Sequence, residues 1–89
     1  MVQKFELGRT LITPGALDAI PGNEVQTALG RHENGDWGNL SEADATENDL
    51  SVEQGFRLLS SYQSSSEIEF WIITEADRSA TTVLLPSEY

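Results

Sequence analysis

The sequence contains no cysteine and a single histidine, His32, among its 89 residues. Without cysteine the chain can form no disulfide, no thiolate metal site and no cysteine nucleophile. One histidine also leaves too few imidazoles for the common transition-metal sites, which use several His or Cys ligands. We therefore expect neither a metal site nor a cofactor.

Basic residues are scarce: five Lys and Arg stand against fifteen Asp and Glu, for a formal net charge of −10. Nucleic acids and anionic membrane surfaces are bound through basic patches, so this composition disfavours direct contact with either. It favours a basic partner, such as a nucleic-acid-binding protein or complex. The alternative is that the charge only keeps the protein soluble.

Long apolar runs are absent as well. None approaches the roughly 20 residues of a membrane-spanning helix. The first residues, Met1–Glu6, lack the apolar core of a secretion signal. We therefore expect a cytoplasmic protein, and a chain of 89 residues predicts one domain, residues 1–89, with one modest core.

Three apolar segments occupy the last third of the chain: Phe56–Tyr62, Ile68–Thr74 and Thr81–Leu85. Two short polar connections separate them, which is typical of a three-stranded antiparallel meander. Upstream, a weak apolar alternation over Val2–Ile12 predicts one N-terminal strand or two short ones. The order of strand, helices and meander predicts an α+β fold with the helices packed on one face of the sheet.

The region between these strands carries signals for two to three short helices. They are residues 14–20 capped by Thr13, 24–32 capped by Asn23, and 42–54 capped by Ser41 and ended by Gly55. The second helix has an apolar stripe of Val25, Ala28, Leu29 and His32. The third has a thinner stripe, and we expect Ala43 and Leu50 to make its light contact with the core.

The middle strand of the meander is apolar on both sides. Phe70 and Ile72 point one way, and Trp71 and Ile73 point the other. One layer of short helices can cover only one face of a sheet, whereas a wet face would show polar residues. We therefore expect Trp71 and Ile73 to be covered by the N-terminal segment, by a second copy of the chain in a homodimer, or by a partner protein.

His32 and Asp36 make the nearest approach to a catalytic pair. A histidine beside a carboxylate can act as a general base, which would suit a small enzyme. His32 also lies on an apolar stripe, where a buried histidine that bonds a carbonyl is the simpler interpretation. Trp37 likewise either fills the core or anchors a partner. Because no catalytic signature accompanies these residues, we expect a protein that is not an enzyme.

Every charged residue from Glu33 to Glu53 is acidic. Two interpretations are open: a solvated helix face, or carboxylates that occupy the nucleic-acid groove of a basic protein. Under the second, the partner-binding residues are Glu33, Asp36, Trp37, Glu42, Asp44, Glu47, Asp49 and Glu53. The scarce arginines are expected to neutralise nearby acids, for example Arg78 with Asp77.

Two strings of the sequence suggest a relationship: Arg31-His32-x-x-Gly35-Asp36-Trp37-Gly38 and residues Trp71–Tyr89. With them the chain resembles a family of short, mostly uncharacterised bacterial proteins often carried on plasmids and prophages. The resemblance spans most of the chain and implies a mobile-element setting without known catalytic residues. It favours an acidic inhibitor that mimics DNA against CRISPR or restriction enzymes. The alternative is a small accessory or adaptor domain whose acidic face has no specific role.

Overall fold

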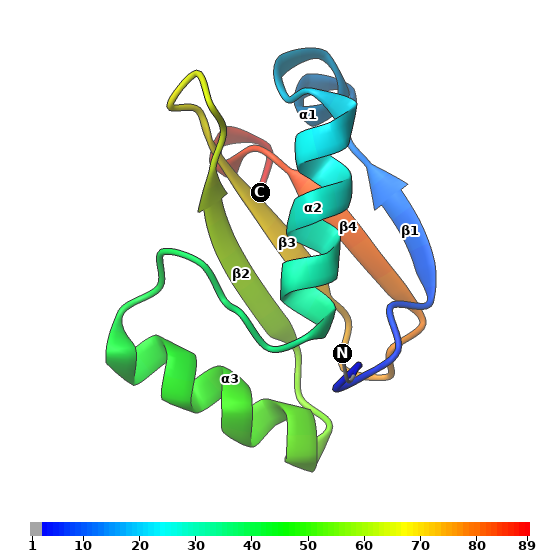
Figure 1. Ribbon diagram of the computed structural model, residues 1–89. Coiled ribbons are helices and arrows are strands. Elements are labelled where there is room, and N and C mark those ends of the chain that lie inside the picture. Colours follow the sequence, from blue (N-terminus) through cyan, green and yellow to red (C-terminus); the bar gives the residue numbers. More distant parts are fainter. Residues whose placement is uncertain (1–2) are drawn as a thin grey trace.

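The computed structural model describes residues 3–89 and shows an α+β fold, as predicted (Figure 1). Val2, where the N-terminal strand was expected to begin, lies outside the described residues. The elements in chain order are β1 (Arg9–Ile12), α1 (Pro14–Ala19), α2 (Gly22–Glu33), α3 (Glu42–Gln54), β2 (Leu58–Gln63), β3 (Glu69–Thr74), β4 (Ala80–Leu84) and the 3-10 turn η1 (Pro86–Glu88).

The four strands form one sheet in the order β1-β4-β3-β2. The meander is confirmed, because β3 pairs antiparallel with both β2 and β4. The N-terminal strand adds in parallel to β4. Of the two short strands that the sequence allowed, only the second forms among residues 3–12, because the chain turns at Gly8, which has a φ of 66°. The first meander strand is shorter too, and Phe56 stands outside it with 57% of its surface exposed.

Helix α2 covers one face of the sheet, as Figure 1 shows. Its predicted stripe is confirmed, since Val25, Ala28, Leu29 and His32 are all buried. The three apolar residues of the stripe form one core with residues of the sheet. The sheet residues are Tyr62, Phe70, Ile72 and Val83. The expected cap at Asn23 is wrong: the helix already begins at Gly22, after Pro21. The Thr13 cap of α1 is confirmed by its bond from the Ala16 N–H.

The opposite face of the sheet is covered in part by the end of the chain itself, which was not among the three expected covers. The turn η1 contacts β3. The rings of Tyr89 and Trp71 pack edge to face, with 5.7 Å between their centroids. Arg57 lies over the Tyr89 ring and donates to its hydroxyl at 2.9 Å. On this face Trp71 is half-buried, and Ile73 is only 4% exposed.

Helix α3 contacts the sheet with a different side from the one predicted. Ala43 is exposed and Leu50 is 50% exposed, so the expectation that they face the core is wrong. Asn48 and Ser51 are buried instead. Ala45 and Val52 pack beside a small core cluster of Phe5, Trp37 and Leu58. The helix therefore docks through polar side chains as much as through apolar ones.

Candidate functional site

Helix α3 lies beside β2, which forms the edge of the sheet opposite β1 (Figure 1). Its start is fixed by Ser41, whose hydroxyl accepts a hydrogen bond from the Asp44 N–H at 3.2 Å. Its end is fixed by Gly55, which adopts the left-handed conformation with φ of 74°. Both caps agree with the sequence prediction, so local signals set the length of the helix.

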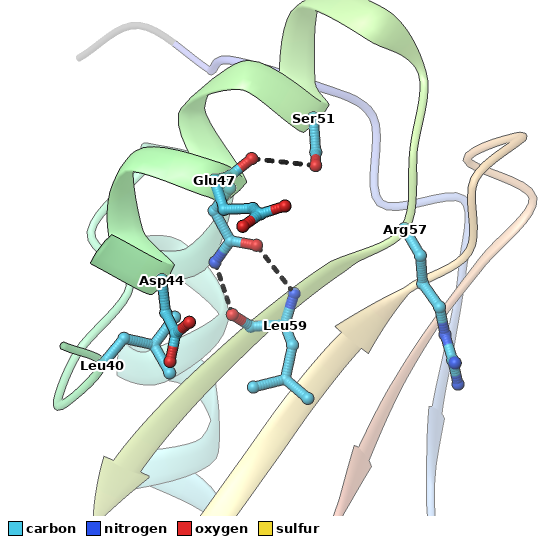
Figure 2. Close-up of a pocket in the computed structure, with 7 residues that line it drawn as sticks. Leu40, Asp44, Glu47, Ser51, Arg57 and Leu59 are labelled. Carbon is cyan, nitrogen blue, oxygen red and sulfur yellow. Dashed lines mark hydrogen bonds between the residues drawn. The ribbon is translucent and has the colours of Figure 1, made fainter. Parts of the chain in front are cut away.

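Asn48 sets the rotation of α3 by binding the edge strand as another strand would. Its side-chain nitrogen donates to the Leu59 carbonyl at 2.5 Å, and its oxygen accepts from the Leu59 N–H at 3.4 Å (Figure 2). Further along β2, Ser61 exchanges hydrogen bonds with the backbone of Trp37 and Asn39. The outer edge of β2 is thereby occupied, which protects it from pairing with another chain.

The five carboxylates of α3 are all exposed: Glu42, Asp44, Glu47, Asp49 and Glu53. The ion pairs found within residues 3–89 are Arg31–Asp36 and Arg57–Glu75, so none of the five carboxylates is neutralised by its own chain. Asp49 alone has a structural bond, because it accepts from the Trp37 indole N–H at 2.9 Å. The carboxylates of α3 are therefore presented to solvent without an ion-pair partner among residues 3–89.

The unexpected rotation of α3 also determines what lies between those acids. With Asn48 and Ser51 turned inward, the helical period of 3.6 residues directs Leu50 outward. Two acidic rows flank it, one of Glu42, Asp49 and Glu53, the other of Asp44 and Glu47. We call this surface, including Ala43 and Leu50, the α3 outer face. It combines an apolar centre with acidic borders.

A groove of about 300 Å³ separates α3 from β2. Figure 2 shows Asp44 and Glu47 on the helix, Leu40 beside Asp44, Leu59 on the strand and Arg57 at the far end. A lysine or arginine from another protein has the shape for such a groove, because its aliphatic stem packs on leucine while its charged end meets carboxylates. The groove therefore extends the α3 outer face towards the sheet.

Three of the predicted partner-binding residues lie outside α3. Glu33 is half-buried at the end of α2. Asp36 accepts hydrogen bonds from Arg31 at 2.8 and 3.2 Å, which lower the pKa of its carboxyl. Trp37 is 5% exposed and stacks on Phe5 with 6.0 Å between ring centroids. The core interpretation of Trp37 is thus confirmed, because almost none of its surface is open to a partner.

His32 is fully buried, and Asp36 does not contact it because that carboxylate binds Arg31. The two ring nitrogens of His32 lie 2.5 Å from the Ser60 hydroxyl and 2.9 Å from the Thr74 hydroxyl. Phe5 and Trp37 pack edge-on against the same ring. The structure therefore does not assemble the predicted general-base pair, and His32 bonds two hydroxyls instead of the expected carbonyl.

The direction of this hydrogen-bond chain follows from its last member. The Thr81 hydroxyl donates to the Leu7 carbonyl at 2.7 Å, so it must accept from Thr74, 2.7 Å away. Thr74 then has only lone pairs for His32, whose Nε2 carries the proton and donates. Nδ1 is left to accept from Ser60. A neutral imidazole with the proton on Nε2 satisfies every member of the chain.

Burial of His32, with a smaller effect of Arg78, lowers the pKa of the imidazole from 6.5 to about 3. The unfolded chain therefore binds more protons than the folded protein between these values. The stabilisation by neutral His32 is complete above pH 6.5 and declines as pH falls towards 3. We expect about 1.4 kcal/mol less free energy of unfolding per pH unit in this window. Urea titrations between pH 6.5 and 5 measure it.

His32→Gln is the matched control, because it cannot titrate while the acidic residues remain the same. Its stability should change less between pH 6.5 and 5 than that of the natural protein. The single imidazole can also be observed directly by nitrogen NMR, where Nε2 should stay protonated and Nδ1 unprotonated at pH 5. An imidazolium signal in the folded protein at that pH would contradict the assignment.

No protein-family model matches the sequence, and comparisons with curated proteins and with solved structures likewise give no match. The resemblance to plasmid- and prophage-borne proteins therefore stays a prediction. Within the part of the chain that the structure describes, no three His, Asp or Glu side chains are grouped so as to hold a metal ion. None of the helices there is long and apolar enough to cross a membrane.

Proposed function

We propose that this chain is a non-enzymatic inhibitor that binds a basic protein through the α3 outer face. The observation that supports it is the set of exposed α3 carboxylates, none of which forms an ion pair within residues 3–89. Uncompensated charge of one sign steers a partner of the opposite sign and makes association fast and sensitive to salt. Leu50 adds an apolar contact at the centre.

The class of partner we propose is a nucleic-acid-binding protein or complex, because such proteins carry basic grooves of the required sign. In its specific form the chain is encoded by a mobile element, acts in the cytoplasm and occupies the DNA-binding surface of a CRISPR or restriction enzyme. The rows of carboxylates on α3 take the place of DNA phosphates. The groove beside β2 receives a lysine or arginine of the partner.

Reversing three α3 charges should abolish this inhibition. The substitutions are Glu42→Lys, Glu47→Lys and Glu53→Lys, which leave Asp49 in place because it binds Trp37. They remove three attractive sites and introduce repulsion, so we expect at least a hundredfold weaker binding. The measurement is phage plating efficiency on bacteria that express the chain beside a CRISPR or restriction system. For a system that the natural chain inhibits, salt-dependent binding to the isolated enzyme complements it.

The control reverses three acids away from α3: Glu6→Lys, Asp18→Lys and Glu67→Lys, all exposed. Each set changes the net charge from −10 to −4, since every acid-to-lysine change adds two charges to the original value. The control variant should keep full inhibition. If both variants lose inhibition equally, the effect comes from net charge and not from the α3 outer face. Binding that salt does not weaken would also contradict the proposal.

A further inference from the structure

Strand β1 forms the open edge of the sheet. It pairs with β4 on one side, and no other strand among residues 3–89 lies on its outer side. Figure 1 shows β1 at the rim, with α2 crossing the face of the sheet and α3 at the opposite rim. Thr10 and Leu11 are exposed on this strand. The edge therefore lacks the protection that Asn48 and the loop around Asn39 give to β2.

Two residues of β1 direct their backbone N–H and C=O groups away from β4. The Arg9 N–H donates to the Ser79 carbonyl at 2.9 Å, and the Thr13 N–H donates to the Val83 carbonyl at 3.0 Å. In a parallel ladder every second residue bonds to the neighbouring strand through its backbone, so the N–H and C=O groups of Leu11 also point to β4. The N–H and C=O groups of Thr10 and Ile12 consequently point away from the sheet. Those four groups are what a further strand would bind.

We propose that β1 pairs antiparallel with β1 of a second copy, about a two-fold axis at Leu11. In this register Thr10 lies opposite Ile12 of the partner subunit, and symmetry repeats the pair. Opposed residues of this kind exchange both hydrogen bonds, so all the outward groups of Thr10 and Ile12 are satisfied. Leu11, which is 41% exposed, meets its own counterpart across the axis. The result is one continuous sheet through both copies.

Charge complementarity supports a second copy as the occupant. The same register places Arg9 opposite Thr13 of the partner subunit, on the face of the sheet that both side chains share. In each copy the Glu88 carboxylate lies at Thr13, bonded to its hydroxyl at 2.5 Å and to the Gly15 N–H at 3.1 Å. The Arg9 guanidinium is exposed and forms no hydrogen bond or ion pair within residues 3–89. Pairing therefore brings an unused cation to a fixed carboxylate, twice per dimer.

The surroundings of β1 also fit a dimer. An apolar groove of about 240 Å³ runs beside the strand between α1 and α2, with Ile12, Leu17, Ile20 and Leu29 in its walls. Leu17 is 67% exposed there. The two-fold axis brings the grooves of both copies to the same face, while the acidic α3 helices stay at opposite ends. Like-charge repulsion between two chains of net charge −10 is thereby kept away from the contact.

Sedimentation of the full chain from about 1 μM to about 1 mM tests the proposal. The mass should rise from 9.8 kDa towards twice that value. Arg9→Glu should weaken the dimer at least tenfold through repulsion from Glu88, and adding Glu88→Arg should recover most of the loss. Thr10→Pro should weaken it similarly, because it removes an outward N–H that the monomer does not use. Circular dichroism confirms that each variant is folded.

Amide hydrogen exchange adds a readout at single residues. In the dimer the Thr10 and Ile12 amides should also be protected, whereas at the lowest concentrations only the Arg9 and Leu11 amides of this strand should be, because they bond to β4. A monomer at every concentration would overturn the proposal, as would a dimer that neither Arg9→Glu nor Thr10→Pro weakens. The proposal is independent of the α3 outer face, since the charge reversals on α3 should leave dimerisation intact.

Discussion

Replacing His32 with alanine is expected to lower the free energy of unfolding by about 3–5 kcal/mol. The substitution removes a fully buried ring and leaves a cavity against Phe5 and Trp37. It also takes the partners from the hydroxyls of Ser60 and Thr74, which are buried and cannot bond water in its place. For a chain of this size such a loss is a large part of the total stability. Thermal and urea unfolding measure it.

Two variants separate the packing of His32 from its hydrogen bonds. Thr74→Val keeps the shape of the side chain but removes the hydroxyl that joins His32 to Thr81. It should lower the free energy of unfolding by about 1–3 kcal/mol. Thr82→Val, on the opposite face of the neighbouring strand and half-buried, is its control and should be nearly neutral. A His32→Ala protein within about 1 kcal/mol of the natural one would contradict the central role of the hydrogen-bond chain.

Arg78→Ala is expected to have the second large effect and to lower the free energy of unfolding by about 2–4 kcal/mol. The Arg78 guanidinium donates to the Ser51 carbonyl at 3.0 Å and to the Phe56 carbonyl at 2.7 Å. Two further bonds reach the carbonyls of Glu75 and Ala76 in its own turn. The charge also lies at the carbonyl end of α3, where a cation is favourable. Arg78 thus joins α3, the start of β2 and the β3–β4 turn.

Lys4→Ala is the control for Arg78, because it removes the same charge from an exposed position. It should change stability by less than about 0.5 kcal/mol. Arg78→Lys should recover only part of the loss, since one ammonium cannot reach carbonyls in several directions as the planar guanidinium does. Equal effects of Arg78→Ala and Lys4→Ala in urea unfolding would reduce the role of Arg78 to net charge.

Arg78 also illustrates a pairing that the sequence misrepresents. It was expected to neutralise Asp77, its neighbour, but the Asp77 carboxylate accepts from the Ser79 N–H instead. The bond of Arg78 to Ser51 spans 27 residues, and that of His32 to Thr74 spans 42. Side-chain types at adjacent positions do not encode such partners. They exist only once the strands and α3 have been brought together.

Helix α3 marks the boundary between the two kinds of information. Its limits follow from Ser41 and Gly55, which act within one turn of the helix, and were predictable. Its rotation was not, because the apolar stripe through Ala43 and Leu50 is thin and the deciding contact is the amide of Asn48 with Leu59. A buried strand edge needs hydrogen bonds more than a further leucine, since unpaired backbone groups are costly to bury.

By itself the sequence determined the order of the elements, the caps of α1 and α3, the buried face of α2 and the net charge of −10. These follow from local periodicity and composition, which no distant contact alters. The tertiary structure decided which side of α3 faces water, what packs against Trp71, where His32 finds its partners and which strand edge stays open. Each of these depends on hydrogen bonds or packing between segments far apart in the chain, and these fix where the charge is displayed.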